Sequence, residues 1–438
     1  MSEARTLSEL GKAAIVTQSL LQDLGLFKQC HVTLGLAAPG VPDAGGRFPV
    51  QAELRVQERG ALMYGVRTEV NSSTREMSLK GHLGVFNALG RAEAFRVSYE
   101  HGNRMSHELL AQYRDPRFLG GYQALTLSGF RARTDHGATS SFVEKRLGAS
   151  AEVDLGAAGR LGAEAVLTEL SDPTMKASRA VVAQLGDRVK LALSYARQGA
   201  AAGALGAATW RSVTEVAGPY GSGVMQFARQ TAEGAVEVPL GGGVALALGA
   251  KAGLLLPFGE SAARPTPITE RLFLGGTSTL RGFHTRGAGP SDARRVPPAD
   301  DGPEGVLGWG GGGNRKEDAL GADLAYCARA AVRAPLPATV EGQRVPVFLH
   351  AFADVGAGAL WRTRVAAAEG APPRSVLDAE ATVQDLAQGW RASAGVGVLA
   401  QTPVGQVEFN VTKVLRSRPG DAFKGLGFQF GVSSHGFE

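Results

Sequence analysis

The stretch Glu270-Arg-Leu-Phe-Leu-Gly-Gly-Thr-Ser-Thr-Leu-Arg-Gly-Phe283 begins with apolar residues, is interrupted by two adjacent glycines and ends in a lone arginine. Because glycine adopts backbone conformations that other residues avoid, the glycine pair predicts a tightly folded loop. That loop would present the guanidinium of Arg281 between Leu280 and Gly282. The polar segment that follows is rich in glycine and proline, which is typical of a long connection.

A second stretch further along the chain, Phe352-Ala-Asp-Val-Gly356, offers one carboxylate, that of Asp354, at the end of an expected strand. An arginine and a carboxylate can form two parallel charge-assisted hydrogen bonds. We therefore expect Arg281 to pair with Asp354 and to pin the loop to the wall of the fold. In a water-filled interior such a pair contributes about 0–1 kcal/mol unless it is shielded from water. The alternative is that both are ordinary solvated charges.

Glycine accounts for 60 of the 438 residues, which weakens helices and suits turns or walls whose inward positions must stay small. Apolar residues make up 44% of the chain and charged residues 20%, so the composition argues against disorder. No apolar run reaches the roughly 18 residues of a membrane-spanning helix. A membrane β-strand, however, needs only about 9–11 alternating residues.

The formal net charge of +5 is spread along the chain without a block of like charges, so we expect no nucleic-acid partner. The two cysteines, Cys30 and Cys327, lie far apart and give no metal-binding spacing. No Ser-His-Asp grouping or catalytic carboxylate pair is placed convincingly. We expect no enzyme activity, no cofactor and no metal.

Beyond residue 61 the polarity alternates with a period of two, as in strands with one apolar and one polar face. The alternation fits a transmembrane barrel with a wet interior and also a soluble antiparallel sheet with one solvated face. An even number of strands favours the closed barrel, which satisfies every backbone group in lipid. Sixteen strands are expected near residues 61–71, 76–86, 93–102, 104–114, 121–132, 146–156, 160–170, 188–198, 207–217, 224–239, 243–256, 320–334, 345–355, 390–401, 405–415 and 425–434.

The chain before these strands predicts a smaller α+β unit. Residues 6–24 place apolar side chains at a helical spacing, and strands are expected around residues 28–36 and 48–57. This unit is too small to bury a full core by itself.

Two connections are long. In residues 257–320 we expect 268–287 to be ordered inside the barrel and 288–318 to be exposed and mobile. In residues 361–389 a short helix is expected near 377–386.

The two stretches and the glycine-rich end of the chain resemble, in this order, the outer-membrane β-barrel assembly family of the bacterial surface antigen type. Residues 87–93 are similar to the turn between the second and third strands of the mitochondrial members, the core barrel of the sorting and assembly machinery. Residues 393–398 and 425–431 are similar to the closing strands of that family. The resemblance implies an all-β fold, a 16-stranded antiparallel transmembrane β-barrel over residues 59–438 with the loop 257–320 folded inward. Residues 1–58 would form a truncated N-terminal POTRA-like α+β segment. The loop–lumen lock implied by the family consists of Leu280, Arg281, Gly282, Phe283, Phe352, Asp354 and Gly356.

The resemblance also implies a membrane insertase that folds β-barrel precursors into the mitochondrial outer membrane through a lateral gate between its first and last strands. A precursor strand would pair with an exposed edge by β-augmentation. Glycines in the last strand would weaken the seam or, equally, only relieve crowding in the wall. The gate residues would be Tyr64, Val66, Thr68, Gly425, Gly427, Phe428, Gln429, Phe430 and Gly431.

The implied partners are unfolded β-barrel precursor proteins, the lipid bilayer and accessory subunits of a sorting and assembly complex. The N-terminus lacks a secretory signal, which for a barrel favours a eukaryotic outer membrane reached from the cytosol. The alternatives are a barrel of the plastid outer envelope for protein translocation or assembly, a passive solute pore and a soluble β-rich binding protein.

Overall fold

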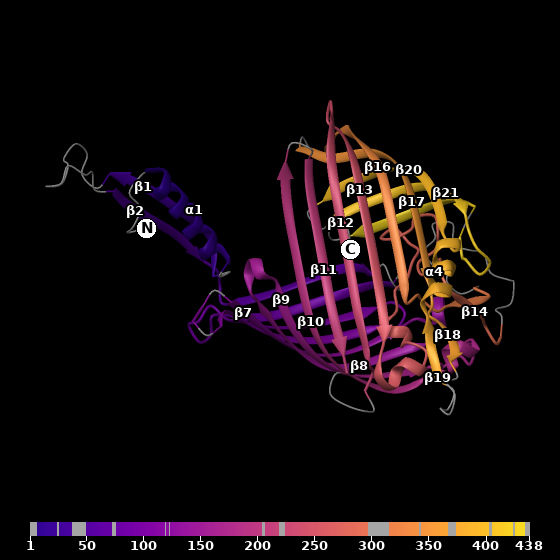
Figure 1. The fold of residues 1–438 in the computed structure, drawn as a ribbon. Helices are drawn as coiled ribbons and strands as arrows, with labels where there is room; N and C mark the ends of the chain where they lie inside the picture. The colour runs from indigo at the N-terminus through magenta and orange to yellow at the C-terminus, as the bar shows by residue number, and fades with distance from the viewer. Residues whose placement is uncertain are drawn as a thin grey trace.

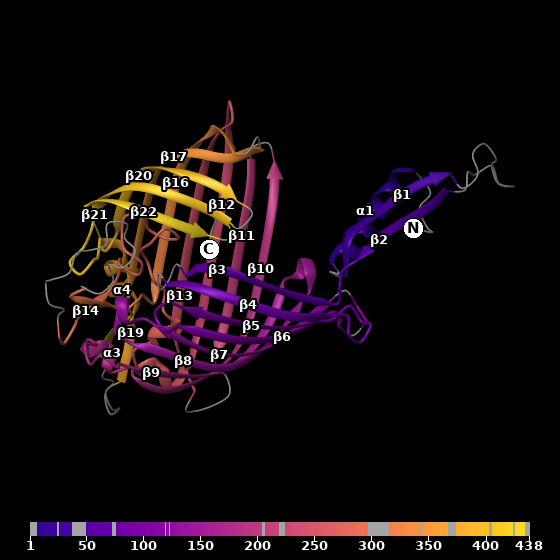
Figure 2. The same ribbon diagram turned by 180° about the vertical axis from the view of Figure 1, so that it is seen from behind.

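The computed structural model describes residues 7–433 except residues 24–25, 37–49, 72–75, 119, 122, 204–205, 219–223, 297–314, 341–342, 367–373, 403–404 and 424. A sixteen-stranded antiparallel sheet dominates the described residues and curls into a barrel (Figures 1 and 2). The all-β, sixteen-stranded antiparallel barrel predicted from the alternating pattern is therefore confirmed.

Each predicted strand overlaps one strand of this sheet. The strands are β3 Leu62–Asn71, β4 Glu76–Phe86, β5 Ala94–Gly102, β6 His107–Phe118, β7 Gln123–Asp135, β8 Val143–Asp154, β9 Arg160–Ser171, β10 Gly186–Gly203, β11 Gly206–Ala217, β12 Phe227–Gly241, β13 Val244–Pro257, β16 Leu324–Val340, β17 Gln343–Ala359, β20 Arg391–Thr402, β21 Gly405–Arg416 and β22 Leu426–Ser433.

Side chains alternate between the two faces of the wall. Outward positions carry exposed apolar groups such as Tyr64 and Phe428, which are 81% and 78% exposed. Inward positions carry buried polar groups such as Thr168 and Asn410. This distribution suits a barrel that faces lipid on the outside and encloses a polar interior.

The sheet ends at β3 and β22. Neighbouring strands pair in chain order except where two long connections intervene, so that β13 pairs with β16 and β17 with β20. Within the described residues β3 pairs only with β4, and β22 only with β21. Figure 2 shows the side of the barrel on which the two end strands lie.

The connections differ at the two ends of the barrel. One end has mostly short turns, including the 3₁₀ turn η1 Gly156–Ala158. The other end carries α2 Gly137–Ser140, α3 Arg179–Val182, β18 Arg362–Ala366, β19 Arg374–Asp378 and α4 Ala379–Gln388. The predicted helix near 377–386 corresponds to α4, whose first turn is capped by the side chain of Asp378.

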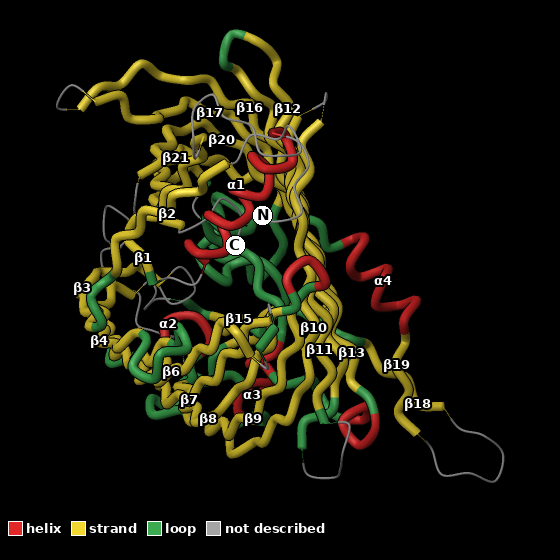
Figure 3. The backbone as a smooth tube through the Cα atoms, turned by 90° about the vertical axis from the view of Figure 1, so that its left-hand side faces the viewer, coloured by secondary structure: helices red, strands yellow, loops and turns green. Residues whose placement is uncertain are grey.

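The connection between β13 and β16 runs inside the ring of strands (Figure 3). It contains η2 Gly259–Ala263, η3 Ile268–Glu270, β14 Ser291–Ala293 and β15 Glu317–Ala319. The expectation that residues 288–318 are exposed and mobile is wrong for the described part, because β14 pairs with β15 and Asp318 is fully buried. Residues 297–314 lie outside the described residues.

The N-terminal unit lies outside the barrel at the end with the short turns (Figures 1 and 2). It consists of α1 Leu7–Asp23 and the antiparallel pair β1 Phe27–Leu36 and β2 Val50–Glu58. These elements agree with the predicted helix and two strands. No helix in the described residues is both long and apolar enough to cross a membrane.

Candidate functional site: the loop fastened inside the barrel

The loop between β13 and β16 turns back on itself at its glycine pair. Leu274 forms an antiparallel bridge with Ala288 across the turn. Gly275 has a φ of +105°, and a Cβ atom at this position would lie 2.3 Å from the carbonyl oxygen of His284. Only glycine permits so close an approach of the two backbone segments.

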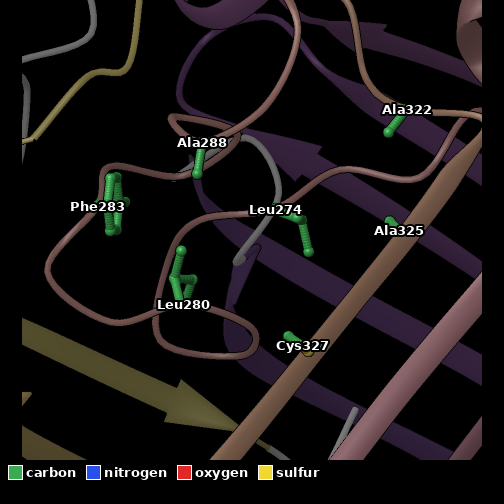
Figure 4. Packing of buried hydrophobic residues seen from close by; sticks show 7 residues of the cluster. All are labelled: Leu274, Leu280, Phe283, Ala288, Ala322, Ala325 and Cys327. Carbon is green, nitrogen blue, oxygen red and sulfur yellow. The ribbon is translucent and has the colours of Figure 1, made fainter. Parts of the chain in front are cut away.

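An apolar cluster holds the loop against the inner wall (Figure 4). Leu280 and Phe283 are 0% and 1% exposed, and they pack with Cys327 of β16. Burying a side chain of this size contributes about 1.5–3 kcal/mol relative to leaving it in water. The full cluster consists of Leu274, Leu280, Phe283, Ala288, Ala322, Ala325 and Cys327.

Arg281 lies between Leu280 and Phe283 in the sequence and makes a two-point ion pair with Asp354 of β17. Arg281 Nε donates to Asp354 Oδ2 at 2.8 Å, and Arg281 Nη2 donates to Asp354 Oδ1 at 2.7 Å. The backbone N–H of Arg281 also donates to Asp354 Oδ2 at 3.1 Å. The two side chains are 3% and 0% exposed, so little solvent screens their attraction.

Neighbouring groups on the wall fix the guanidinium further. Its carbon lies 3.5 Å from the centre of the Phe352 ring, in cation–π geometry. Glu408 of β21 approaches Arg281 Nη1 at 3.8 Å. Arg329 of β16 lies 3.9 Å from Asp354 and donates to the loop carbonyl of Thr277 at 3.0 Å. Two cations thus converge on one buried carboxylate.

The same loop contacts the last strand of the barrel. The N–H of Gly282 donates to Gln429 Oε1 at 3.1 Å, and Gln429 Nε2 donates to the carbonyl oxygen of Phe283 at 3.4 Å. A Cβ atom at Gly431 would lie 2.7 Å from Thr277 of the loop. One loop segment therefore touches both β17 and the end strand β22.

The remaining candidate residues take different places. Tyr64, Val66 and Thr68 are exposed on β3, and Phe428 is exposed on β22. Gly425 lies in the bend before β22, with open space around it, whereas Gly427 is buried within the strand. The ring of Phe430 lies 4.7 Å from that of Phe409 of β21, tilted by 47°. A Cβ atom at Gly356 would lie 2.9 Å from the carbonyl oxygen of Tyr326, so the wall is crowded there.

A second anchor on the opposite wall was not predicted from the sequence. The carboxylate of Asp318 in β15 accepts hydrogen bonds from Arg294 Nε at 2.8 Å, from Ser141 Oγ at 2.7 Å and from the N–H of Ser178 at 2.8 Å. Asp318 therefore ties the far part of the loop to the connections that carry α2 and α3.

A third contact fastens the beginning of the loop. Glu270 lies 3.5 Å from Lys190 of β10 and 3.1 Å from Arg229 of β12. Burial raises the pKa of Glu270 above its usual range, although the two cations oppose this shift. In the described part of the chain no group of His, Cys, Asp or Glu residues is arranged to hold a metal ion.

Several residues of the site carried no recognisable sequence signal on their own. Glu408 and Arg329 are single charges in alternating strands, and their proximity arises only when β16, β17 and β21 close around the loop. The available signal was that both residues fall at inward-facing positions of the alternating pattern in their predicted strands.

Comparisons with known proteins agree with this architecture. A SAM50-like protein of Drosophila melanogaster is 25% identical over 305 residues, which make up 66% of each chain. The sorting and assembly machinery component 50 homolog of Mus musculus is 25% identical over 296 residues, covering 66% of this chain and 61% of that protein. The matched regions thus span about two thirds or less of these relatives' own lengths.

Solved structures show a similar fold. The crystal structure of BamA from Haemophilus ducreyi lacking POTRA domains 1–3 superposes with a TM-score of 0.66 at 15% identity, covering 95% of this chain and 77% of that one. CdiB from Escherichia coli gives a TM-score of 0.52 at 16% identity, covering 95% and 69%. A family model described as the Omp85 superfamily domain matches residues 87–435. The chain therefore belongs to the Omp85 superfamily.

Proposed function

We propose that this protein is a membrane insertase that receives unfolded β-barrel precursors and folds them into the mitochondrial outer membrane. The observation that carries the proposal is the seam: β3 and β22 each have one paired edge within the described residues, and the internal loop contacts β22 directly. The similarity to sorting and assembly machinery proteins of fly and mouse supports the assignment to the mitochondrial membrane.

The driving force follows from the chemistry of an unpaired strand edge in lipid. Backbone N–H and C=O groups that face hydrocarbon without a partner destabilise the strand that carries them. A precursor strand that pairs with β3 gives hydrogen-bond partners to the open edge of β3 and to its own facing edge, in the manner of β-augmentation. Each added strand also buries its apolar face in the bilayer. Neither step requires a nucleotide or a metal.

The loop acts in this proposal as the support of the gate. Arg281 and Asp354 fix the loop to β17, and the loop then holds β22 through Gln429. Releasing the contact at Gln429 would free the last strand from the loop without disturbing the wall at β17. The roles proposed for Leu280, Gly282, Phe283, Phe352 and Gly356 are to shape this support.

The glycines of β22 have different proposed roles. Gly431 accommodates the loop, since a side chain there would collide with Thr277. Gly427 would weaken the strand, because glycine packs no side chain and lowers strand stability. The exposed residues Tyr64, Val66 and Thr68 of β3 and Phe428 of β22 would contact lipid or the incoming strand.

We further propose that residues 1–58 form a partial POTRA-like segment and that residues 59–438 form the barrel. The partners would be unfolded precursors, the bilayer and accessory subunits of a sorting and assembly complex. A tagged chain in cells with both organelles distinguishes the mitochondrial outer membrane from the plastid envelope. Exclusive recovery with the plastid would replace the mitochondrial assignment by the plastid one.

A disulfide across the seam tests the gate. Outward cysteines replace Val66 of β3 and Phe428 of β22, in a background with Cys30 and Cys327 changed to serine. Neighbouring outward pairs extend the panel, because no register joins the two strands. Under oxidation the tethered protein should fail to insert a labelled barrel precursor into vesicles, and reduction should restore insertion.

The matched control joins two strands that are already paired. Val66 and Gly81 are register partners on β3 and β4, and a Cβ atom at Gly81 meets nothing within 4 Å. A disulfide between these two positions should leave insertion unchanged. Full insertion by the seam-tethered protein would refute lateral opening.

A further inference from the structure

The outer wall carries a groove of about 680 Å³ across β6 to β10, lined almost entirely by apolar surface. Its floor is a continuous row of small residues in register on four neighbouring strands. Larger side chains flank the row on both sides, with Phe95, Tyr113 and Leu127 at one edge and Leu191 and Leu193 at the other. The floor consists of Ala111, Gly129, Ala149 and Ala165.

Cations lie on the same outward face, directly beyond the groove. Arg131 and Arg133 follow Gly129 by two and four residues on β7, which places them about 7 Å and 14 Å further along the strand. Both lie toward the end of the barrel that carries α2. In the next strand Lys145 is the register partner of Arg133.

These two arginines are not neutralised by the protein. Among the described residues Arg131 makes no ion pair, and the buried Nε of Arg133 has no hydrogen-bond partner. Lys145 pairs with the outward Glu169 at 2.8 Å, and Asp135 accepts the N–H of Gly137 at 2.6 Å. Among the described residues, neither of these carboxylates forms an ion pair with Arg131 or Arg133.

A large part of this wall carries no such charges. In the described strands β11, β12, β13, β16, β17 and β20, no outward position holds Asp, Glu, Lys or Arg. A cation on the lipid-facing side destabilises a barrel increasingly with its depth in the bilayer. An anion that reaches Arg131 and Arg133 from the lipid would remove that penalty.

A second groove provides an internal comparison. It lies across β12 to β20, has a volume of about 610 Å³ and is equally apolar. The described strands β12, β13, β16, β17 and β20 give it no outward cation, and Arg416 of β21 lies 3.9 Å over the ring of Trp390 at its edge. Apolar shape therefore exists twice on the barrel, and the first groove differs in leading along one strand to two arginines, Arg131 and Arg133.

We propose that the groove on β6 to β10 is a binding site for a phospholipid with an anionic headgroup. The acyl chains lie in the groove over Gly129, and the phosphate accepts hydrogen bonds from Arg131 and Arg133. The lipid belongs to the leaflet on the side of the long connections. This site lies on the wall away from the seam, and it does not depend on the proposed insertase activity.

The charge arm of the test uses purified full-length protein in non-ionic detergent, titrated with dioleoyl phosphatidylglycerol or dioleoyl phosphatidylcholine. Native mass spectrometry counts the bound lipids. We expect the wild type to retain one phosphatidylglycerol in preference to phosphatidylcholine. Arg131→Gln with Arg133→Gln should weaken phosphatidylglycerol binding roughly 30-fold, from the typical contribution of two cations near an anionic lipid surface. Arg197→Gln with Lys413→Gln removes two outward cations elsewhere and should leave this binding unchanged.

The shape arm keeps both arginines and fills the groove. A Cβ atom at Gly129 meets nothing within 4 Å, so Gly129→Leu adds volume without a backbone clash. It should displace both lipids from this groove, whereas Gly234→Leu in the second groove should not change phosphatidylglycerol retention.

Equal loss of phosphatidylglycerol binding in the two double variants would overturn the proposal. Equal retention of the two lipids by the wild type, or unchanged retention in Gly129→Leu, would overturn it as well. If cysteine crosslinking from position 131 in membranes captured an acidic protein segment in place of lipid, the occupant proposed here would be wrong.

Discussion

Removing the charge of Asp354 should detach the internal loop from the barrel wall. The change Asp354→Asn keeps the size of the side chain and leaves Arg281 and Arg329 beside a neutral amide. Breaking a buried ion pair costs about 3–5 kcal/mol, and the lower end applies here because Glu408 still lies 3.8 Å from Arg281 Nη1. The pair is 3% and 0% exposed, so the buried value applies here. A cost of about 3 kcal/mol increases the detached population roughly 150-fold.

Cys327 provides a native reporter of this detachment. It is 5% exposed beneath the loop, in the cluster with Leu280. The chain has two cysteines, so Cys30→Ser leaves Cys327 as the single thiol. The rate of maleimide labelling of the folded protein in detergent then measures how often the loop leaves the wall. We expect Asp354→Asn to raise this rate roughly 100-fold or more.

The exposed pair Lys145–Glu169 supplies the control, because its side chains are 50% and 46% exposed. Exposed pairs contribute about 0–1 kcal/mol, so Glu169→Gln should change the labelling rate very little. Heat-modified migration of each variant on gels verifies that the barrel is folded. A labelling rate in Asp354→Asn equal to that of the wild type would refute the role of the ion pair in holding the loop.

Three further changes test the contacts around the site. Gln429→Leu removes two hydrogen bonds between β22 and the loop, worth about 1–3 kcal/mol together, and should speed amide exchange in β22; unchanged exchange would mean that the loop does not hold this strand. Gly431→Val forces a branched side chain against Thr277 and should raise thiol labelling beneath the loop, whereas Gly425→Val, with open space around it, should not; equal rates would contradict the close approach. Burial lowers the pKa of His136 below its usual 6.5, so below about pH 6.5 the unfolded chain binds a proton there that the folded protein does not. Stability toward urea should therefore fall between pH 7.5 and 5.5, and His136→Gln should flatten that fall; an identical pH dependence in the variant would exclude His136 as its source.

Much of the barrel could be predicted from the sequence because alternation is a local property. The alternation within each strand shows which residues face inward and which outward; on β21, Val407, Phe409 and Val411 mark the outward face. The Arg281 and Asp354 signatures could be matched for a similar reason, since each is a short contiguous motif. Their contact in the structure joins residues of one loop and one strand.

The far half of the loop could not be predicted. β14 and β15 are three residues long each, too short to show any periodicity. These two strands are held in place through Asp318, whose hydrogen-bond partners Ser141 and Ser178 lie 177 and 140 residues away in the chain. Polar contacts between such distant positions leave no pattern in the local sequence, so the glycine- and proline-rich composition favoured a mobile segment.

The contact of Gln429 with the loop was also beyond the sequence. Its inward parity on the last strand could be read from the alternation, but the approach of the loop to β22 depends on the glycines at positions 282 and 431. Gly282 has a φ of +86°, and a Cβ atom there would lie 3.2 Å from Val414. Such close approaches become visible only in three dimensions.

Crosslinking of an arrested barrel precursor to the seam tests the account most directly. Photoreactive residues placed in turn at positions 62–71 of β3 would report which positions touch the last strand of the precursor during insertion. The account predicts crosslinks from β3 to one precursor strand, with the crosslinked position on the precursor shifting steadily as the probe moves along β3. These crosslinks should disappear when β3 is tethered to β22. Photoreactive residues on the outer face of β12 serve as the control; crosslinks from β12 with none from β3 would contradict the account.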